Sequence, residues 1–256
     1  MPDNTRGSAR AALITGAARR IGATIALVLA RAGYAVVLHA NNSREDAERL
    51  AEAITSSGGR ASVVLADLTD REAVRGLIPA AAAFGPLTLL VNNAGEFEPD
   101  DIETMSHARF QRAISVNLEA PLFLSQAFVG QAPAGLDASI VNILDQRVFK
   151  PNPRFFSYTL SKSALFTATT TLAQALAPKI RVNAVAPGPT LPSPRQTEVQ
   201  FAAQAESLPL QRGPRPEDIA QAVLYLAHAT AVTGVTLPVD GGQHLSWRTV
   251  DSEAVE

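Results

Sequence analysis

Short, continuously apolar runs recur along the chain, separated by longer segments in which apolar residues return every three or four positions. Continuous rather than alternating apolar character is typical of strands that are buried on both faces of a parallel sheet. The segments between the runs have helical periodicity, since Ile21, Ile25, Val28 and Leu29 fall on one helix face. We therefore expect strands over residues 11–14, 35–38, 61–66, 87–91, 139–144, 180–186 and 236–239.

This alternation of strands and helices predicts an α/β fold. Repeated βα units imply right-handed crossovers and a single-domain, Rossmann-type, doubly wound parallel sheet of about seven strands in a three-layer αβα sandwich. No internal repeat or interdomain linker interrupts residues 1–256, and the core is expected over about 10–245. The polar ends, including the residues after Trp247, are expected to be disordered.

Several helix starts are marked by their sequence. Ser43 with Asp46, and Thr69 with Glu72, have the spacing of capping boxes. Pro216 suits the first turn of a helix that runs to about residue 228.

The composition limits the classes of function. The chain has 256 residues, 46% of them hydrophobic, and its formal net charge of −2 gives no basic excess for nucleic acid. The absence of cysteine excludes disulfides and thiolate chemistry and fits a cytoplasmic protein. We find no signal peptide, no apolar stretch long enough to cross a bilayer, and no metal-ligand spacing among the four histidines.

A glycine-containing turn follows the first apolar run. It comprises Thr15-Gly16-Ala17-Ala18-Arg19-Arg20-Ile21-Gly22 and leads into the first helix. The N-terminus of a helix offers free N–H groups and a positive dipole end to a pyrophosphate, so this turn predicts a dinucleotide site. A glycine pattern alone is also compatible with an ordinary tight turn between a strand and a helix.

Tyr158 and Lys162 lie four residues apart on a predicted helix and therefore share one face. An ammonium beside a phenol lowers its pKa, and such a phenol can protonate a carbonyl or imine that receives a hydride. The same spacing is common on solvated helices; the nucleotide turn upstream favours the catalytic interpretation. Irregular, proline-containing segments at 145–153 and 187–194 follow predicted strands, where ligands bind in such sheets.

Over roughly residues 10–245 the chain resembles the short-chain dehydrogenase/reductase family. Its further motifs occur in the family's order: Asn92-Asn93-Ala94-Gly95, Asn117, Pro187-Gly188 and Asp240-Gly241-Gly242. The resemblance implies that Tyr158, Lys162 and Asn117 are catalytic. It also implies that Lys162 binds the nicotinamide ribose, and that Asn117 holds a water connecting Lys162 to solvent.

Two departures from that family narrow the resemblance. Arg20 replaces the usual middle glycine of the nucleotide turn, and Asp145, thirteen residues before Tyr158, replaces the usual catalytic serine. Both are similar to pteridine and dihydromonapterin reductases, which also carry an aromatic residue where Phe97 stands. The resemblance implies that Arg20, Phe97, Asp145 and Tyr158 contact the substrate, with Phe97 stacked on its ring. A loop hydrophobe packed on the domain is the alternative for Phe97.

The end of the second predicted strand favours NADPH over NAD, because no acid occupies residues 39–44 to bind the ribose hydroxyls. Pteridine reductases have an arginine where this chain has Asn42, so we expect Arg44 or Arg19 to compensate. Taken from the turn and the resemblance together, the cofactor residues are Gly16, Arg19, Arg20, Ile21, Gly22, His39, Asn41, Asn42, Ser43, Asp67, Leu68, Asn93, Ala94, Gly95, Tyr158, Lys162, Pro187, Gly188 and Thr190.

The sequence thus predicts an NADPH-dependent reductase that transfers hydride to a pterin-type ring, from dihydropterin to tetrahydropterin, with Tyr158, Lys162 and Asp145 supplying the proton. A generic reductase of ketones or 3-oxoacyl thioesters and a catalytically silent NADP-binding protein are the alternatives. Residues 187–207 are expected to form a lid. The resemblance also implies a homotetramer. Four apolar residues suit either its interface or the buried core of one subunit: Leu118, Leu122, Leu165 and Phe166.

Overall fold

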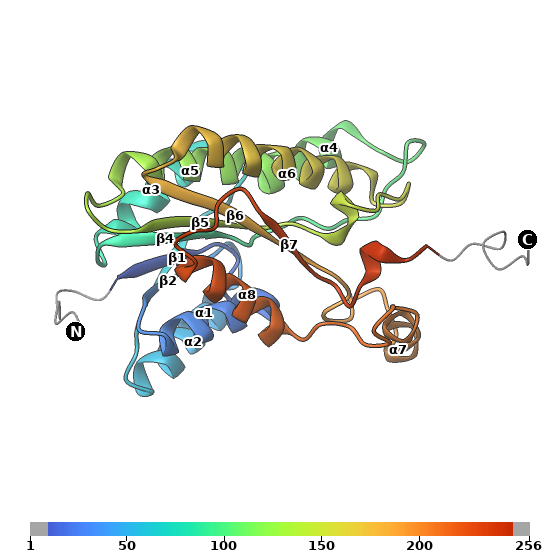
Figure 1. The fold of residues 1–256 in the computed structure, drawn as a ribbon, viewed down its shortest axis with the longest axis horizontal. Coiled ribbons are helices and arrows are strands. Elements are labelled where there is room, and N and C mark those ends of the chain that lie inside the picture. Colours follow the sequence, from blue (N-terminus) through green and yellow to red (C-terminus); the bar gives the residue numbers. More distant parts are fainter. Residues whose placement is uncertain (1–9, 248–256) are drawn as a thin grey trace, which may run out of the picture.

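In a computed structural model of the chain, which describes residues 10–247, one parallel sheet lies between two layers of helices (Figure 1). The ends predicted to be disordered lie outside the described residues. The strands are β1 (Ala11–Ile14), β2 (Ala35–Ala40), β3 (Arg60–Leu65), β4 (Leu87–Asn92), β5 (Ala138–Ile143), β6 (Ile180–Pro187) and β7 (Thr236–Val239). Their order in the sheet is β3-β2-β1-β4-β5-β6-β7, and every neighbouring pair is parallel. The predicted fold class is confirmed.

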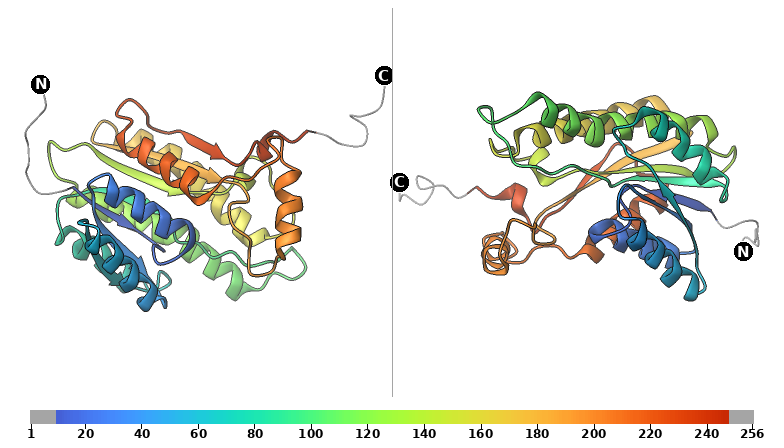
Figure 2. Two further views of the ribbon diagram at one scale, coloured as in Figure 1. Left: turned by 90° about the horizontal axis from the view of Figure 1, so that it is seen from below. Right: turned by 180° about the vertical axis from the view of Figure 1, so that it is seen from behind.

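The helices cover both faces of the sheet. One face carries α1 (Arg20–Arg31), α2 (Arg44–Ser56) and α8 (Pro216–His228). The opposite face carries α3 (Arg71–Ala82), α4 (His107–Ile114), α5 (Ala120–Gln131) and α6 (Phe156–Leu176) (Figures 1 and 2). The short helix α7 (Glu198–Glu206) stands apart from both layers, at the right of Figure 1.

The apolar strands are continuous because their successive side chains enter different cores. In β1, Ile14 packs into the core beneath α1 and α8, where it meets Ile25 and Val223. Its neighbour Leu13 points the other way, into the core that contains Phe128 of α5. Side chains alternate across a strand, so a strand covered on both faces needs an apolar residue at every position.

The strand order places the functional edge of the molecule. From β1 the chain adds β2 and β3 on one side of the sheet, and from β4 it adds β5, β6 and β7 on the other side. The junction between β1 and β4 is therefore the topological switch point. In open α/β sheets ligands bind there, outside the carboxyl ends of the strands.

Pro216 occupies the first turn of α8 as predicted, but the capping boxes were wrong. Ser43 precedes α2 without a side-chain cap, and the Asp46 carboxylate that would complete the box pairs with Arg19 and Arg49 instead. In α3 the cap is Asp70, whose carboxylate accepts from the backbone N–H groups of residues 72 and 73. Thr69 instead donates its hydroxyl to Asp67.

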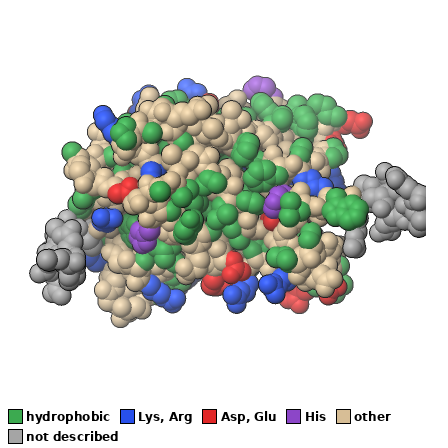
Figure 3. Space-filling model, viewed as in Figure 1, with side chains coloured by type: hydrophobic (Ala, Val, Ile, Leu, Met, Phe, Trp, Pro, Cys, Tyr) green, Lys and Arg blue, Asp and Glu red, His purple; other side chains and the backbone are tan. Residues whose placement is uncertain are grey.

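Charges of both signs are interspersed on the face seen in Figure 3, in keeping with the small net charge. Within residues 10–247, no helix combines the length and hydropathy required to cross a lipid bilayer. Leu165 is buried, and Leu118 and Phe166 pack against the same small core, which supports the core role for these three residues. The homotetramer stays a prediction.

Candidate active site

A pocket of about 700 Å³ opens at the carboxyl ends of the strands, at the switch point between β1 and β4. Most of the predicted site residues line it, although they come from turns and helices far apart in the sequence. Of the predicted residues, its walls contain Gly16, Arg19, Arg20, Ile21, Gly22, His39, Asn41, Asp67, Leu68, Asn93, Ala94, Gly95, Phe97, Asp145, Tyr158, Lys162, Pro187, Gly188 and Thr190. Asn42, Ser43 and Asn117 lie outside this lining.

The nucleotide turn is closed tightly against the loop after β4. A Cβ on Gly22 would lie 2.2 Å from the Gly16 carbonyl oxygen, so only glycine fits there. Thr15 Oγ1 accepts from the backbone N–H groups of Asn93 (2.9 Å) and Ala94 (3.0 Å), and Asn93 Nδ2 donates to Thr15 O at 2.8 Å.

The end of α1 that faces the pocket suits an anionic group. Arg19 precedes the helix without capping it by its side chain, and the first turn carries no acidic residue. The free N–H groups and positive dipole end therefore have no competing carboxylate on this helix. Together with the glycine-only turn, this fits the pyrophosphate of a dinucleotide.

His39 joins the nucleotide turn to the sheet. Its Nδ1 accepts from the backbone N–H of Gly16 at 3.1 Å, and its Nε2 lies 3.1 Å from the carbonyl oxygen of Ala66. These partners fit a neutral ring with the proton on Nε2. Burial lowers the pKa of His39, which favours the same neutral form.

The region expected to hold a ribose phosphate contains an acid that the sequence analysis assigned only to a helix cap. Asp46 enters from the first turn of α2 and pairs with Arg19, and hydrogen bonds from Arg19 and Arg49 lower its pKa. Arg44 pairs with Glu48 on the exposed side of α2 and does not line the pocket. Of the two arginines expected to compensate for Asn42, Arg19 is the one in place.

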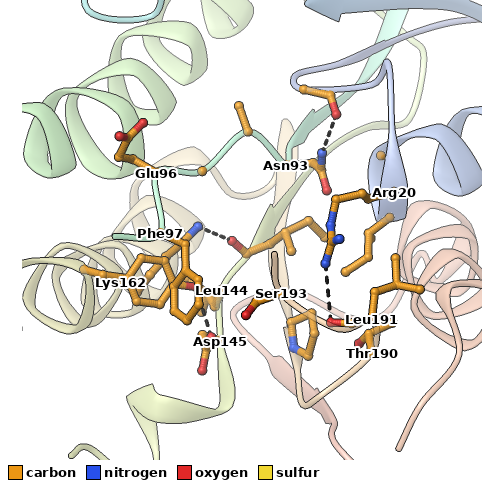
Figure 4. Close-up of a pocket in the computed structure, with 18 of the residues that line it drawn as sticks. Arg20, Asn93, Glu96, Phe97, Leu144, Asp145, Lys162, Thr190, Leu191 and Ser193 are labelled. Atoms are coloured by element: carbon orange, nitrogen blue, oxygen red, sulfur yellow. Dashed lines mark hydrogen bonds between the residues drawn. The ribbon is translucent and has the colours of Figure 1, made fainter. Parts of the chain in front are cut away.

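Tyr158, Lys162 and Asp145 meet at the other end of the pocket. The Tyr158 hydroxyl donates to Asp145 Oδ2 at 3.0 Å, and Lys162 Nζ donates to the Ile143 carbonyl oxygen at 2.7 Å. Figure 4 separates this end, with Phe97, Asp145 and Lys162, from the end that holds Asn93 and Arg20. The Tyr158 phenol and the glycine-containing turn thus border one cavity.

The electrostatics of this end differ from the sequence expectation. Burial, followed by the charge of Asp145 and its hydrogen bond, raises the pKa of Tyr158 well above 10, so the expected lowering by Lys162 was wrong. Burial lowers the pKa of Lys162 itself to about 8. A buried ammonium is costly, and the Ile143 carbonyl oxygen only partly replaces its water.

Asn117 acts beside the pocket, from the π-helical turn Ser115–Glu119 between α4 and α5. Its Oδ1 accepts from the Glu96 backbone N–H (2.8 Å), and its Nδ2 donates to the Glu96 carbonyl (3.0 Å) and to Ser161 Oγ (3.0 Å). It therefore fixes the loop carrying Phe97 to helix α6. The water predicted at Asn117 stays a prediction.

Phe97 stands at the catalytic end but already has an aromatic partner. Its ring lies parallel to that of Phe155 at a centroid distance of 4.2 Å and meets the Tyr158 ring edge-on at 4.7 Å. Sequence reasoning missed Phe155 and Arg147, whose guanidinium carbon is 5.2 Å from both phenylalanine ring centroids. Their nearness to Tyr158 and Asp145 in the sequence was the available signal.

Two arginines connect the predicted lid to the rest of the site. Arg20, with a positive φ of 55°, donates to the carbonyl oxygen of Leu191 at 3.4 Å (Figure 4) and to that of Pro192 at 3.1 Å. Arg195, on the lid itself, donates to the Phe97 carbonyl oxygen at 2.6 Å and pairs with Glu98. Residues 187–207 therefore lie across the pocket from its nucleotide end to its catalytic end.

Among the described residues, no group of side chains is arranged to hold a metal ion.

Comparison with known proteins agrees with this geometry. Residues 16–244 match the family model described as enoyl-(acyl carrier protein) reductase. An uncharacterized oxidoreductase of Methylorubrum extorquens is 37% identical over 91% of this chain and 97% of its own length. A cis-4-hydroxycyclohexanecarboxylate dehydrogenase of Sinomonas cyclohexanicum is 36% identical, covering 91% and 96%.

Among solved structures, the FolM alternative dihydrofolate reductase 1 of Brucella suis, in complex with NADP, is similar with a TM-score of 0.92. It is 48% identical, and the match covers 94% of this chain and 98% of that one. The chain belongs to the short-chain dehydrogenase/reductase family.

Tyr158→Phe should abolish turnover and leave dinucleotide binding nearly intact, because it removes the hydroxyl bonded to Asp145 and leaves the nucleotide turn unchanged. Loss of a positioned general acid lowers rates on the order of 10²–10⁴-fold. Steady-state kinetics and fluorescence titration with NADPH measure the two effects. Activity within a few-fold of wild type would exclude Tyr158 as the proton donor.

Lys162 should make stability depend on pH. Burial lowers the pKa of Lys162 from its usual 10.5, the value expected in the unfolded chain, to about 8 in the folded chain. Between these two pH values the unfolded chain binds more protons. Folding stability therefore rises from pH 8 to 10.5, by at most about 1.4 kcal/mol per pH unit. Urea unfolding of Lys162→Met should lack this rise. Parallel pH curves for the two proteins would contradict the buried ammonium.

Proposed function

We propose that this chain is an NADPH-dependent reductase that transfers hydride to a pterin-type ring, converting a dihydropterin to a tetrahydropterin. The observation that carries the proposal is the hydrogen bond between Tyr158 and Asp145 beside the ring of Phe97. A carboxylate stands where most relatives have a serine, and an aromatic ring borders the same proton donor. The similarity to a FolM alternative dihydrofolate reductase supports the same class of substrate.

The cofactor end of the pocket supports NADP. The turn at Gly16 and Gly22 and the uncapped start of α1 would hold the pyrophosphate, and Arg19 would meet a ribose 2′-phosphate once released from Asp46. Four similar solved structures contain NADP or NADPH, two FolM proteins among them. Bound NADPH supplies the hydride, and the chain supplies orientation and the proton.

The residues of the catalytic end divide the remaining work. The Tyr158 hydroxyl turns from Asp145 toward the substrate, gives its proton to the ring nitrogen of the C=N bond being reduced, and later regains a proton from solvent. Asp145 accepts the Tyr158 hydrogen bond and orients the phenol. Lys162, buried in the wall of the pocket, would present its ammonium to the ribose hydroxyls of the nicotinamide.

The flat faces at this end suit a flat heteroaromatic substrate. Phe97 and Phe155 already stack in parallel, with an interplanar angle of 3°. A pterin ring can form the same type of stack with Phe97 by taking the place of Phe155. The lid contacts of Arg20 and Arg195 would exclude water from the closed site.

The substrate assay follows NADPH absorbance with dihydrobiopterin, dihydromonapterin, dihydrofolate and a panel of ketones. The proposal expects turnover of at least one dihydropterin at a kcat/KM well above that of every ketone. Turnover of ketones alone would identify a generic carbonyl reductase. No turnover with any compound would favour a noncatalytic NADP-binding protein.

Asp145→Ser provides the sharper test, because serine is the usual residue of the family. A serine hydroxyl has neither the second oxygen that Asp145 presents to Arg147 nor the negative charge that strengthens these bonds. Loss of a charge-assisted hydrogen bond of this kind should lower dihydropterin kcat/KM by about tenfold or more. For a carbonyl reductase the new serine hydroxyl can donate to the substrate carbonyl, which offsets this loss and leaves the change neutral or beneficial. Full dihydropterin activity in Asp145→Ser would remove the main support for the pterin proposal.

Arg19→Ala should weaken NADPH binding while leaving NADH binding nearly unchanged, because only NADPH carries the 2′-phosphate. A lost charge-assisted contact costs about 1.5–3 kcal/mol, or roughly 10–150-fold in Kd. Arg44→Ala is the matched control, since Arg44 lies on α2 but outside the pocket. Equal losses for NADPH and NADH in Arg19→Ala, or a larger loss in Arg44→Ala, would contradict this assignment.

A further inference from the structure

Arg147 follows Asp145 by two residues, in the short 3₁₀ helix Gln146–Val148 on the pocket wall. Its backbone N–H donates to Asp145 Oδ1 at 2.8 Å. Its side-chain Nη1 reaches both carboxylate oxygens, Oδ1 at 3.3 Å and Oδ2 at 3.1 Å. Oδ2 is also the atom that accepts the Tyr158 hydroxyl. The phenol, the carboxylate and the guanidinium are thus joined in one chain of contacts.

These contacts fix the carboxylate in place. In each of these hydrogen bonds Asp145 is the acceptor and the other residue is the donor, and both carboxylate oxygens take part. The guanidinium is in turn held against aromatic rings, 5.2 Å from the centroids of Phe97 and Phe155. Its side chain is only 18% exposed, so solvent screens its charge less than that of a surface arginine.

The negative charge that appears during proton transfer needs a nearby cation. When Tyr158 gives up its proton, a phenolate is left 3.0 Å from the Asp145 carboxylate, and the two repel. Lys162 points its ammonium at the Ile143 carbonyl oxygen, and its nitrogen is 5.9 Å from the Tyr158 ring centroid. Of the charges that shift the pKa of Tyr158, Asp145 raises it and Arg147 lowers it.

We propose that Arg147 is a positioning residue for proton transfer: it holds the Asp145 carboxylate where it accepts the Tyr158 hydroxyl, and it offsets the charge left when the proton departs. This inference depends on the proton-donor role of Tyr158 and applies to a C=N or a C=O substrate. In either case carbon gains the hydride from NADPH, the heteroatom gains the Tyr158 proton, and solvent restores the phenol.

The test compares Arg147→Met, which keeps the apolar stem without the charge, with Arg147→Lys, which keeps the charge without the fork. In Arg147→Met, kcat should fall on the order of 10–100-fold while KM changes less than about threefold. The alkaline limb of the kcat profile that belongs to Tyr158, which lies above that of Lys162, should move to higher pH, because the phenol becomes a weaker acid. Arg147→Lys should recover part of kcat.

Arg195→Met is the matched control. Arg195 lies 5.9 Å from the centroids of the same two rings, but it pairs with Glu98 rather than Asp145. Its loss should raise KM and leave the alkaline limb of the kcat profile at the same pH. The other charged groups bordering Tyr158 are unchanged in all three variants; besides Asp145 and Lys162 they are Glu96, Glu98, Asp100, Arg109 and Arg112.

NADPH titration of each variant checks that the nucleotide site is folded. Wild-type kcat and an unmoved limb in a correctly folded Arg147→Met would overturn the inference. If the wild type reduces ketones but no dihydropterin, the proposed function fails, and the comparison is then made with a ketone. A crystal structure of Arg147→Met gives a readout independent of substrate: the Asp145–Tyr158 contact should lengthen, and an unchanged contact would contradict the positioning role.

Discussion

The catalytic end of the pocket depends on the carboxylate of Asp145. One of its oxygens accepts a hydrogen bond from the Tyr158 hydroxyl, and both accept from the Arg147 guanidinium. Among the residues that the structure describes, no other group accepts a hydrogen bond from the Tyr158 hydroxyl or forms an ion pair with Arg147. The carboxylate also makes the phenol a weaker acid, because it raises the pKa of Tyr158. The site therefore combines a buried phenol, its carboxylate acceptor and a cation that offsets the charge of that carboxylate.

The sheet determines where this group can act. Asp145 follows β5, the nucleotide turn follows β1, and Phe97 follows β4, so parallel strands bring all three to one edge. Arg20 and Arg195 then attach the segment after β6 to both ends of the pocket. A cofactor bound at one end and a substrate at the other would share a cavity closed by the same lid.

The sequence was sufficient for features encoded locally. Continuous apolar runs predicted the seven strands, and the Tyr158–Lys162 spacing predicted their common helix face. It was insufficient where the partner is distant. Asp46 comes to Arg19 from a different helix, and burial, which no spacing reveals, reverses the expected effect on the Tyr158 pKa. The Asp145–Arg147 contact is local, yet its meaning depends on Tyr158 lying across from it.

The most direct test of the account is to follow the hydride itself. The enzyme is incubated with a dihydropterin, a ketone and NADPH that carries deuterium at the transferable position of nicotinamide C4, and the products are analysed by mass spectrometry. The account predicts a tetrahydropterin that has gained one deuterium, with little label in the alcohol. Deuterium in the alcohol and none in the pterin would contradict it.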